Sequence, residues 1–211
     1  MSNRIDYENL IIDLYLIKKM NRRGHLYIVK ILYLYEESLM KQSLIGSTYK
    51  MYKYHFGPYN AMIKPNVEAL ARRGFLSSKV QYFPRQDEFH TLYEKNEQTE
   101  TFLKEIDELI QENAPVFEPL DGLIEKFKGY TGKRLMNYIY SLEKTGVKQT
   151  RMNDYKLNDI VVDPCLLKRP KFAFKLDEDW YDTIEVLLDP SYKTRLEQAI
   201  QDAREGRVVF N

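Results

Sequence analysis

The sequence contains a single cysteine and only three histidines in 211 residues. A lone Cys165 excludes an internal disulfide and any metal site built from several thiolates, and it fits a reducing cytoplasm. The chain also has little net charge, +1, because 32 Lys and Arg residues nearly balance 31 Asp and Glu residues. It shows neither the roughly 18 consecutive apolar residues of a membrane span nor the apolar core of a signal peptide. We therefore expect a soluble, cytoplasmic protein without a membrane partner.

Residues that could carry chemistry are isolated from one another in the sequence. His25, His55 and His90 form none of the spaced pairs that bind catalytic metals, and Cys165 has no histidine near it in the sequence. The acidic stretch DEDWYD, residues 177–182, lacks the glycine and spacing of a calcium loop and is interpreted as a solvated acidic turn. We expect no catalytic residues, no metal site and no cofactor, and therefore not an enzyme.

The first hundred residues have the order helix, helix, helix, hairpin. Asp6 is a candidate N-cap for a first amphipathic helix, and a second helix follows over residues 28–39. The aromatic stretch TYKMYKYHF then leads into a turn at Gly57-Pro58. A third helix ends at Gly74, and FLSSKVQYF and EFHTLYE read as a β-hairpin. This order is typical of a winged helix-turn-helix.

Two more helices are expected from residue 99 and after Pro115, as an antiparallel pair, followed by a helix with Thr131 as N-cap. Beyond residue 150 the helical period is lost, which indicates an extended arm. A short final helix begins with Asp189 as N-cap and Pro190 at its first position. The predicted fold is mainly α with a small β-hairpin (α+β): a winged-helix-like domain over residues 1–150, and an acidic, aromatic arm ending in a short helix over residues 151–211.

Charge and aromatic residues are unevenly distributed in the second half of the chain. Residues 121–156 carry eight Lys and Arg residues against four acids, whereas the arm is acidic from Asp159 to Asp189. These two regions either pair with each other or face a partner. Aromatic residues in a segment without its own core likewise either dock on the protein's own body or anchor a partner. The arm residues concerned are Phe172, Phe174, Trp180 and Tyr181.

Four motifs resemble those of the Panacea (SocA-like) domain family. They are KILYLYEESL at residues 30–39, YHFGPYN at residues 54–60, VEALARRGFL at residues 67–76, and the helix-cap-helix LIEKFKGYTGKRLMNYIYSLE at residues 123–143. In the last motif Tyr138 and Tyr140 replace the family's usual ending. The resemblance covers residues 10–145 in order and spacing.

The resemblance implies an antitoxin that neutralises a cognate protein toxin by binding it, without catalytic residues. A second likeness points the same way, because LLDPSYKTRLEQAIQDAREGRVVF is similar to the tail of many bacterial antitoxins. The Gly57-Pro58 turn should fold the preceding aromatic stretch back onto the second helix, so that most of its aromatics are core. We expect Tyr54, His55 and Tyr59 to remain partly exposed around the turn as a contact patch.

Other functions compete with this interpretation. A winged-helix transcription regulator would place the third helix in the major groove of operator DNA and the wing against phosphate. Its candidate contacts, Lys64, Arg72, Arg73 and Arg85, are few for a phosphate footprint. An adaptor that delivers a partner to a protease would share the binding chemistry of an antitoxin. An enzyme ranks last, because no nucleophile, paired acid or metal set is visible.

Overall fold

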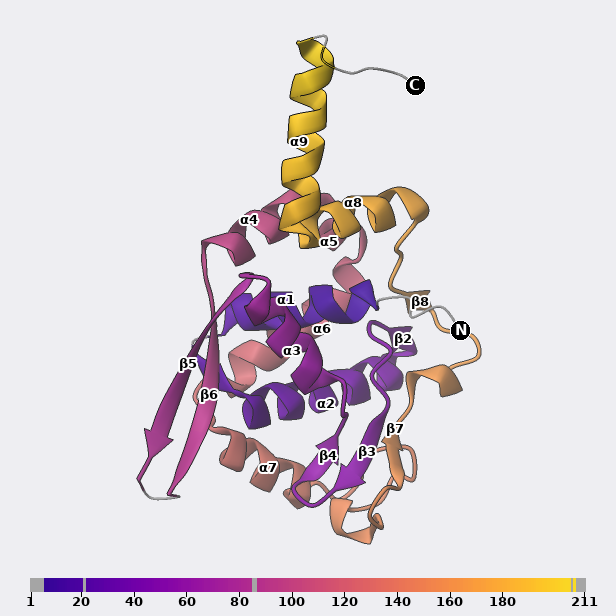
Figure 1. Cartoon of the computed structure of the whole chain (residues 1–211). Coiled ribbons are helices and arrows are strands. Elements are labelled where there is room, and N and C mark those ends of the chain that lie inside the picture. Colours follow the sequence, from indigo (N-terminus) through magenta and orange to yellow (C-terminus); the bar gives the residue numbers. More distant parts are fainter. Residues whose placement is uncertain (1–5, 21, 85–86, 206, 208–211) are drawn as a thin grey trace. The chain divides into compact units, whose positions relative to one another are not determined.

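The computed structural model describes residues 6–20, 22–84, 87–205 and 207, and its helices and small sheets form an α+β fold (Figure 1). The chain divides into two units, Met1–Lys175 and Leu176–Asn211. None of the helices in the described part of the chain combines the length and apolar character that crossing a bilayer requires.

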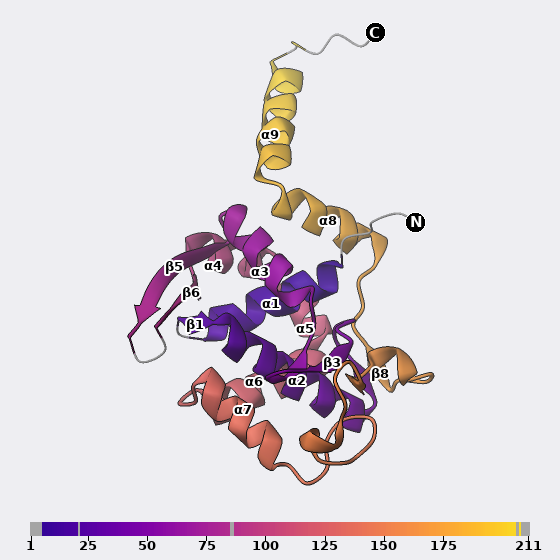
Figure 2. The same cartoon turned by 60° about the horizontal axis from the view of Figure 1, so that its bottom comes forward.

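Helix α2 (His25–Gln42) is the centre of the first unit. Apolar side chains surround it on every side, and a helix of this kind must be covered by other elements. Helices α6 and α7 pack against it, and Figures 1 and 2 both show α1 and α7 on opposite sides of α2. Helix α3 in turn packs on α1. The bounds of these helices are α1 Tyr7–Lys19, α3 Ile63–Arg72, α6 Ala114–Phe127 and α7 Gly132–Ser141.

Two hairpins interrupt the helices. Strands β5 (Leu76–Phe83) and β6 (Glu88–Lys95) pair over their whole length, and the short β1 (Arg23–Gly24) adds to β6, which gives the order β1-β6-β5. Gly74, at the end of α3, has φ +84°, as predicted for a helix-ending glycine. The second hairpin consists of β3 (Met51–Tyr54) and β4 (Gly57–Tyr59).

The helices expected in the middle of the chain are present, but the one expected from residue 99 is divided into two. The segment from residue 97 onwards forms α4 (Glu97–Glu105) and α5 (Asp107–Glu112) before α6 begins. Thr131 caps α7 as predicted, because its hydroxyl accepts a hydrogen bond from the Arg134 backbone N–H.

The arm differs from the sequence prediction, because residues 151–175 belong to the first unit. Strand β7 (Ile160–Val162) pairs with β3, and β8 (Phe172–Ala173) pairs in parallel with β2 (Leu44–Ile45). At its end the Lys175 backbone N–H donates to the Asn113 side-chain oxygen at 2.7 Å. Pairing with strands far away in the sequence therefore moves the boundary from residue 150 to Lys175. Two 3₁₀ turns, Met152–Asp154 and Pro164–Leu166, complete this segment.

The second unit contains α8 (Glu178–Leu188) and α9 (Pro190–Arg204). Helix α9 follows Asp189 as predicted, and its expected stop at Gly206 lies outside the described residues. Helix α8 was not expected. The interpretation of residues 177–182 as an acidic turn was wrong, because Asp177 accepts from the Trp180 backbone N–H and begins this helix.

A buried polar cluster holds the segment that leads into β3. The Tyr49 hydroxyl donates to the Asp13 carboxylate at 2.6 Å, and the Ser47 hydroxyl donates to Glu36. Asp13 and Glu36 are both almost fully buried, and burial raises the pKa of each carboxyl group to about 8. Both are therefore mainly protonated at neutral pH, and they fasten residues 47–49 to α1 and α2.

The titration of Asp13 predicts a pH-dependent stability. Between about pH 4 and about pH 8 the unfolded chain has released a proton that the folded chain keeps, so the free energy of unfolding should fall as the pH rises. The slope from this group is about 1.4 kcal/mol per pH unit, and it should vanish above pH 8. Asp13→Asn keeps an acceptor for Tyr49 but cannot ionise. Urea denaturation at several pH values should show Asp13→Asn gaining stability over the wild type as the pH rises. Glu105→Gln, at an exposed position, is the control and should not show this gain. If the free energies of unfolding of Asp13→Asn and the wild type changed in parallel with pH, the assignment would be contradicted.

A close approach at Gly46 gives a second prediction. A Cβ atom there would lie 2.2 Å from the Tyr35 hydroxyl and 2.7 Å from side-chain atoms of Leu39 and Val116. Gly46→Ala should therefore lower the free energy of unfolding by about 1–3 kcal/mol through overpacking. Gly122→Ala is the matched control, because this α6 residue has open space around it and should gain about 0.5–1 kcal/mol. Guanidinium melts measure both, and an unchanged Gly46→Ala protein would refute the packing argument.

Candidate partner-binding site

The turn between β3 and β4 displays a group of aromatic rings. The Tyr54 ring lies 4.6 Å from His55 and 5.5 Å from Tyr59, measured between centroids, and Tyr59 lies 6.1 Å from His25. Tyr54 is 45% exposed and Phe56, at the tip, is 67% exposed. The three residues expected around this turn, Tyr54, His55 and Tyr59, are thus brought together. We call Tyr54, His55, Phe56 and Tyr59 the turn patch.

Local sequence explains the shape of this hairpin. Gly57 has φ +88°, a conformation that residues with a side chain rarely adopt, and a Cβ there would lie 3.2 Å from the Tyr140 ring. Asn60 holds the far side, since its side-chain amide donates to the Lys50 carbonyl at 2.8 Å. The patch therefore projects from a closed turn backed by α7.

The alternation of β3 decides which aromatics are exposed. Tyr49 and Met51 are buried, whereas Tyr52 is 39% exposed. The expectation that most aromatics of this stretch are core is therefore wrong, and Phe56 was missed altogether. Its place directly before Gly57-Pro58 was the available signal, because a residue at a turn tip has few neighbours to cover it.

Two lysines lie beneath the turn. Lys30, on α2, is buried and donates from its ammonium group to the Pro58 carbonyl at 2.6 Å. Burial, together with the positive charge of Lys53, lowers the pKa of Lys30 to about 7. Lys53 donates to the Tyr140 hydroxyl and to the Tyr54 carbonyl, each at 2.9 Å. Neither lysine is ion-paired with a carboxylate among the described residues.

His25 lies at the edge of this cluster and is neutral. Burial and the nearby Lys64 lower the pKa of its imidazole to about 4. Within the described part of the chain, both ring nitrogens are enclosed without a hydrogen-bond partner. His90 lies elsewhere, beside Glu88 on the β5–β6 hairpin.

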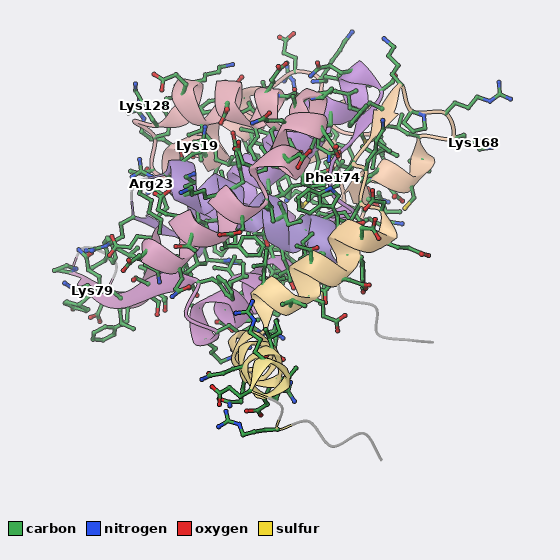
Figure 3. The ribbon with its side chains drawn as sticks, turned by 90° about the horizontal axis from the view of Figure 1, so that it is seen from above. Lys19, Arg23, Lys79, Lys128, Lys168 and Phe174 are labelled. Atoms are coloured by element: carbon green, nitrogen blue, oxygen red, sulfur yellow. The ribbon has the colours of Figure 1, made fainter. Side chains whose placement is uncertain are left out.

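The arm aromatics of the first unit dock on that unit. Phe174 packs against Phe117 of α6 with ring centroids 5.9 Å apart, and its backbone N–H donates to Ile45. Figure 3 shows Phe174 among the helices, whereas Lys79 and Lys168 point outward. Phe172 is half-buried, with the Lys175 ammonium 5.3 Å from its ring centre. Trp180 and Tyr181 lie separately, at the start of α8 in the second unit.

Part of the charge segregation is satisfied within the first unit. Lys148 pairs with Asp159 at 2.5 Å, and Lys50 pairs with Asp163 at 2.7 Å. Acids of the arm therefore neutralise lysines of the body, which accounts for some of the acidic and basic runs without a partner.

The candidate nucleic-acid contacts form a sparse surface. Lys64 lies 3.7 Å from Glu68 one turn along α3, and Arg72 and Arg73 are exposed at the end of that helix. Arg85 lies outside the described residues. The hairpin carries apolar groups that sequence analysis did not single out: Val80, Tyr82 and Phe89 are exposed, and the last two rings are 5.0 Å apart.

A hollow of about 370 Å³ lies near the end of α2 and is lined in part by Met40, Val147 and Leu166. Its carboxylate, Glu37, already pairs with Lys41 at 3.0 Å and accepts from the Gly146 backbone N–H. The polar group of this hollow is thus engaged with the protein itself.

In the described part of the chain, no three His, Cys, Asp or Glu side chains are grouped so as to hold a metal ion. Cys165 is exposed. Comparisons with family models, curated proteins and solved structures gave no match to the chain. The resemblance to the Panacea domain therefore stays a prediction that depends on the motifs quoted above.

Proposed function

We propose that this chain is an antitoxin-like binding protein that neutralises a partner toxin by direct complex formation. The turn patch is the observation that carries this proposal. Exposed aromatic rings held on a closed hairpin suit a protein contact, because they bury a large area with little loss of side-chain freedom. The Panacea-like motif YHFGPYN coincides with this patch.

The patch leads to a test in cells. The chain should restore growth when it is co-expressed with the toxic product of a neighbouring gene, and the two proteins should co-purify in fixed stoichiometry. Replacing Tyr54 and Phe56 together by Ala should weaken the complex at least about thirtyfold, since an aromatic anchor contributes about 2 kcal/mol or more. Isothermal titration calorimetry measures the change.

Phe89→Ala is the matched control, because this ring is 72% exposed on the other hairpin. The control should bind and rescue like the wild type. A harmless neighbour that does not co-purify would refute the antitoxin proposal. Equal weakening by Phe89→Ala would refute the assignment of the contact to the turn patch.

A winged-helix regulator of transcription is the second candidate, and strand order favours it. With β2, β3 and β4 set aside as an insertion between α2 and α3, the order α1, β1, α2, α3, β5, β6 and the sheet order β1-β6-β5 suit a helix-turn-helix with a wing. Its weak point is charge, because the hairpin exposes Val80, Tyr82 and Phe89 beside few basic groups, and Lys64 lies near Glu68. An antitoxin that represses its own operon would combine both functions, and a protease adaptor would use the same patch.

Salt dependence tests the DNA-binding candidate. Binding of duplex DNA from upstream of the gene should weaken with salt, and replacing Arg72 and Arg73 by Ala should reduce the slope of log K against log salt by about 2. Fluorescence anisotropy at several salt concentrations provides the measurement. Lys104→Ala, on α4, should leave the slope unchanged. Absence of binding at 50 mM salt, or no change in the double variant, would reject this candidate.

A further inference from the structure

We propose that the corner formed by Lys53 and Tyr140 beneath the turn patch binds a carboxylate of the partner protein, next to an apolar side chain that covers Tyr54 and Phe56. The inference rests on the proposed function and names the chemistry of the partner segment, which is an acidic residue beside an apolar one.

Unbalanced positive charge is the first observation. The positive charge of Lys53 contributes to the lowered pKa of Lys30, and the charges of Lys30 and Lys64 both lower the pKa of His25. The acid that acts on His25 is Glu68, which is paired with Lys64. Lys50, at the other end of the same hairpin, contrasts with them because Asp163 neutralises it at 2.7 Å.

Because Lys30 is buried, the uncompensated positive charge is unfavourable for its ammonium group. A buried ammonium group is stable only if a carboxylate or several dipoles compensate for its lost hydration. Among the described residues, the Lys30 ammonium donates to the Pro58 carbonyl, and the Lys53 ammonium donates to the Tyr140 hydroxyl and the Tyr54 carbonyl. An anion arriving at Lys53 would stabilise both ammonium groups in a partly dry site, where charge interactions are strong.

The geometry favours one carboxylate over a polyanion. Lys53 and Tyr140 are half-buried and Lys30 is enclosed. A ligand can therefore approach the ammonium and hydroxyl donors of Lys53 and Tyr140 at one place on the surface. A nucleic-acid backbone would need a row of accessible cations. One carboxylate needs one ammonium and one hydroxyl donor, and the exposed Tyr54 and Phe56 rings beside them suit an apolar neighbour.

Peptide titration tests the inference on the full chain. The probe is an acetylated, amidated hexapeptide of alternating Glu and Leu, and a Gln and Leu hexapeptide is its neutral counterpart. In NMR spectra the acidic peptide should shift the resonances of Lys53, Tyr54 and Tyr140, and the neutral peptide should bind about tenfold more weakly, because the hydrogen bonds to a charged group are lost. Lys53→Met should cause a similar loss, and Lys53→Arg should restore most of the affinity.

Lys104→Met removes one exposed positive charge on α4 and should bind the acidic peptide like the wild type. The inference is overturned if the acidic peptide causes no shifts at the turn, or if Lys104→Met weakens binding as much as Lys53→Met. It is also overturned if oligothymidylate binds this corner more tightly than the peptide, which would assign the site to single-stranded nucleic acid. Each of these results leaves the growth-rescue experiment unaffected, so the two proposals fail separately.

Discussion

Burial of residues 27–37 of α2 is the constraint on which the rest of the first unit depends. Charged side chains in a buried stretch of helix need partners among the segments that cover it. Lys30 therefore requires the Pro58 carbonyl, Glu36 requires the Ser47 hydroxyl, and Glu37 requires Thr145 and Gly146. Each of these partners lies in a non-helical segment. The polar groups of one helix thus fix where three non-helical stretches of chain must lie, and one of those stretches, the β3–β4 hairpin, carries the turn patch.

The segments that depend on local signals could be predicted from the sequence. Gly74 and Thr131 mark helix boundaries through their own backbone and side-chain chemistry, and the β5–β6 hairpin pairs neighbouring segments. The course of residues 151–175 could not be predicted, because β7 and β8 are short and take their partners from distant strands. Helix α8 was not predicted for a different reason. Trp180, Ile184 and Leu188 have helical spacing, but the four acids of residues 177–182 favoured an acidic turn.

The candidate site could likewise be predicted from the sequence only in part. A Gly-Pro turn after an aromatic stretch was enough to predict that Tyr54, His55 and Tyr59 lie near one another. The exposure of Phe56 depends on what covers the turn tip, and the lysines beneath it come from α2 and β3, with Tyr140 from α7. No local sequence pattern predicts that side chains from α2, β3 and α7 come together. The docking of Phe174 on Phe117 was one of two alternatives left open by the sequence, and only the fold decides between them.

The pairing of Leu44 with Phe172 also affects how the protein is made. Strand β2 emerges from the ribosome well before β8, so the contacts that complete the first unit have a large sequence separation and a high loop-closure cost. Until β7 is synthesised, the outer edge of β3 has no strand beside it and is open to pairing with other chains. Synthesis of the last part of the first unit thus closes the edge of the hairpin that carries the turn patch, and truncation before residue 160 would leave that edge exposed to aggregation.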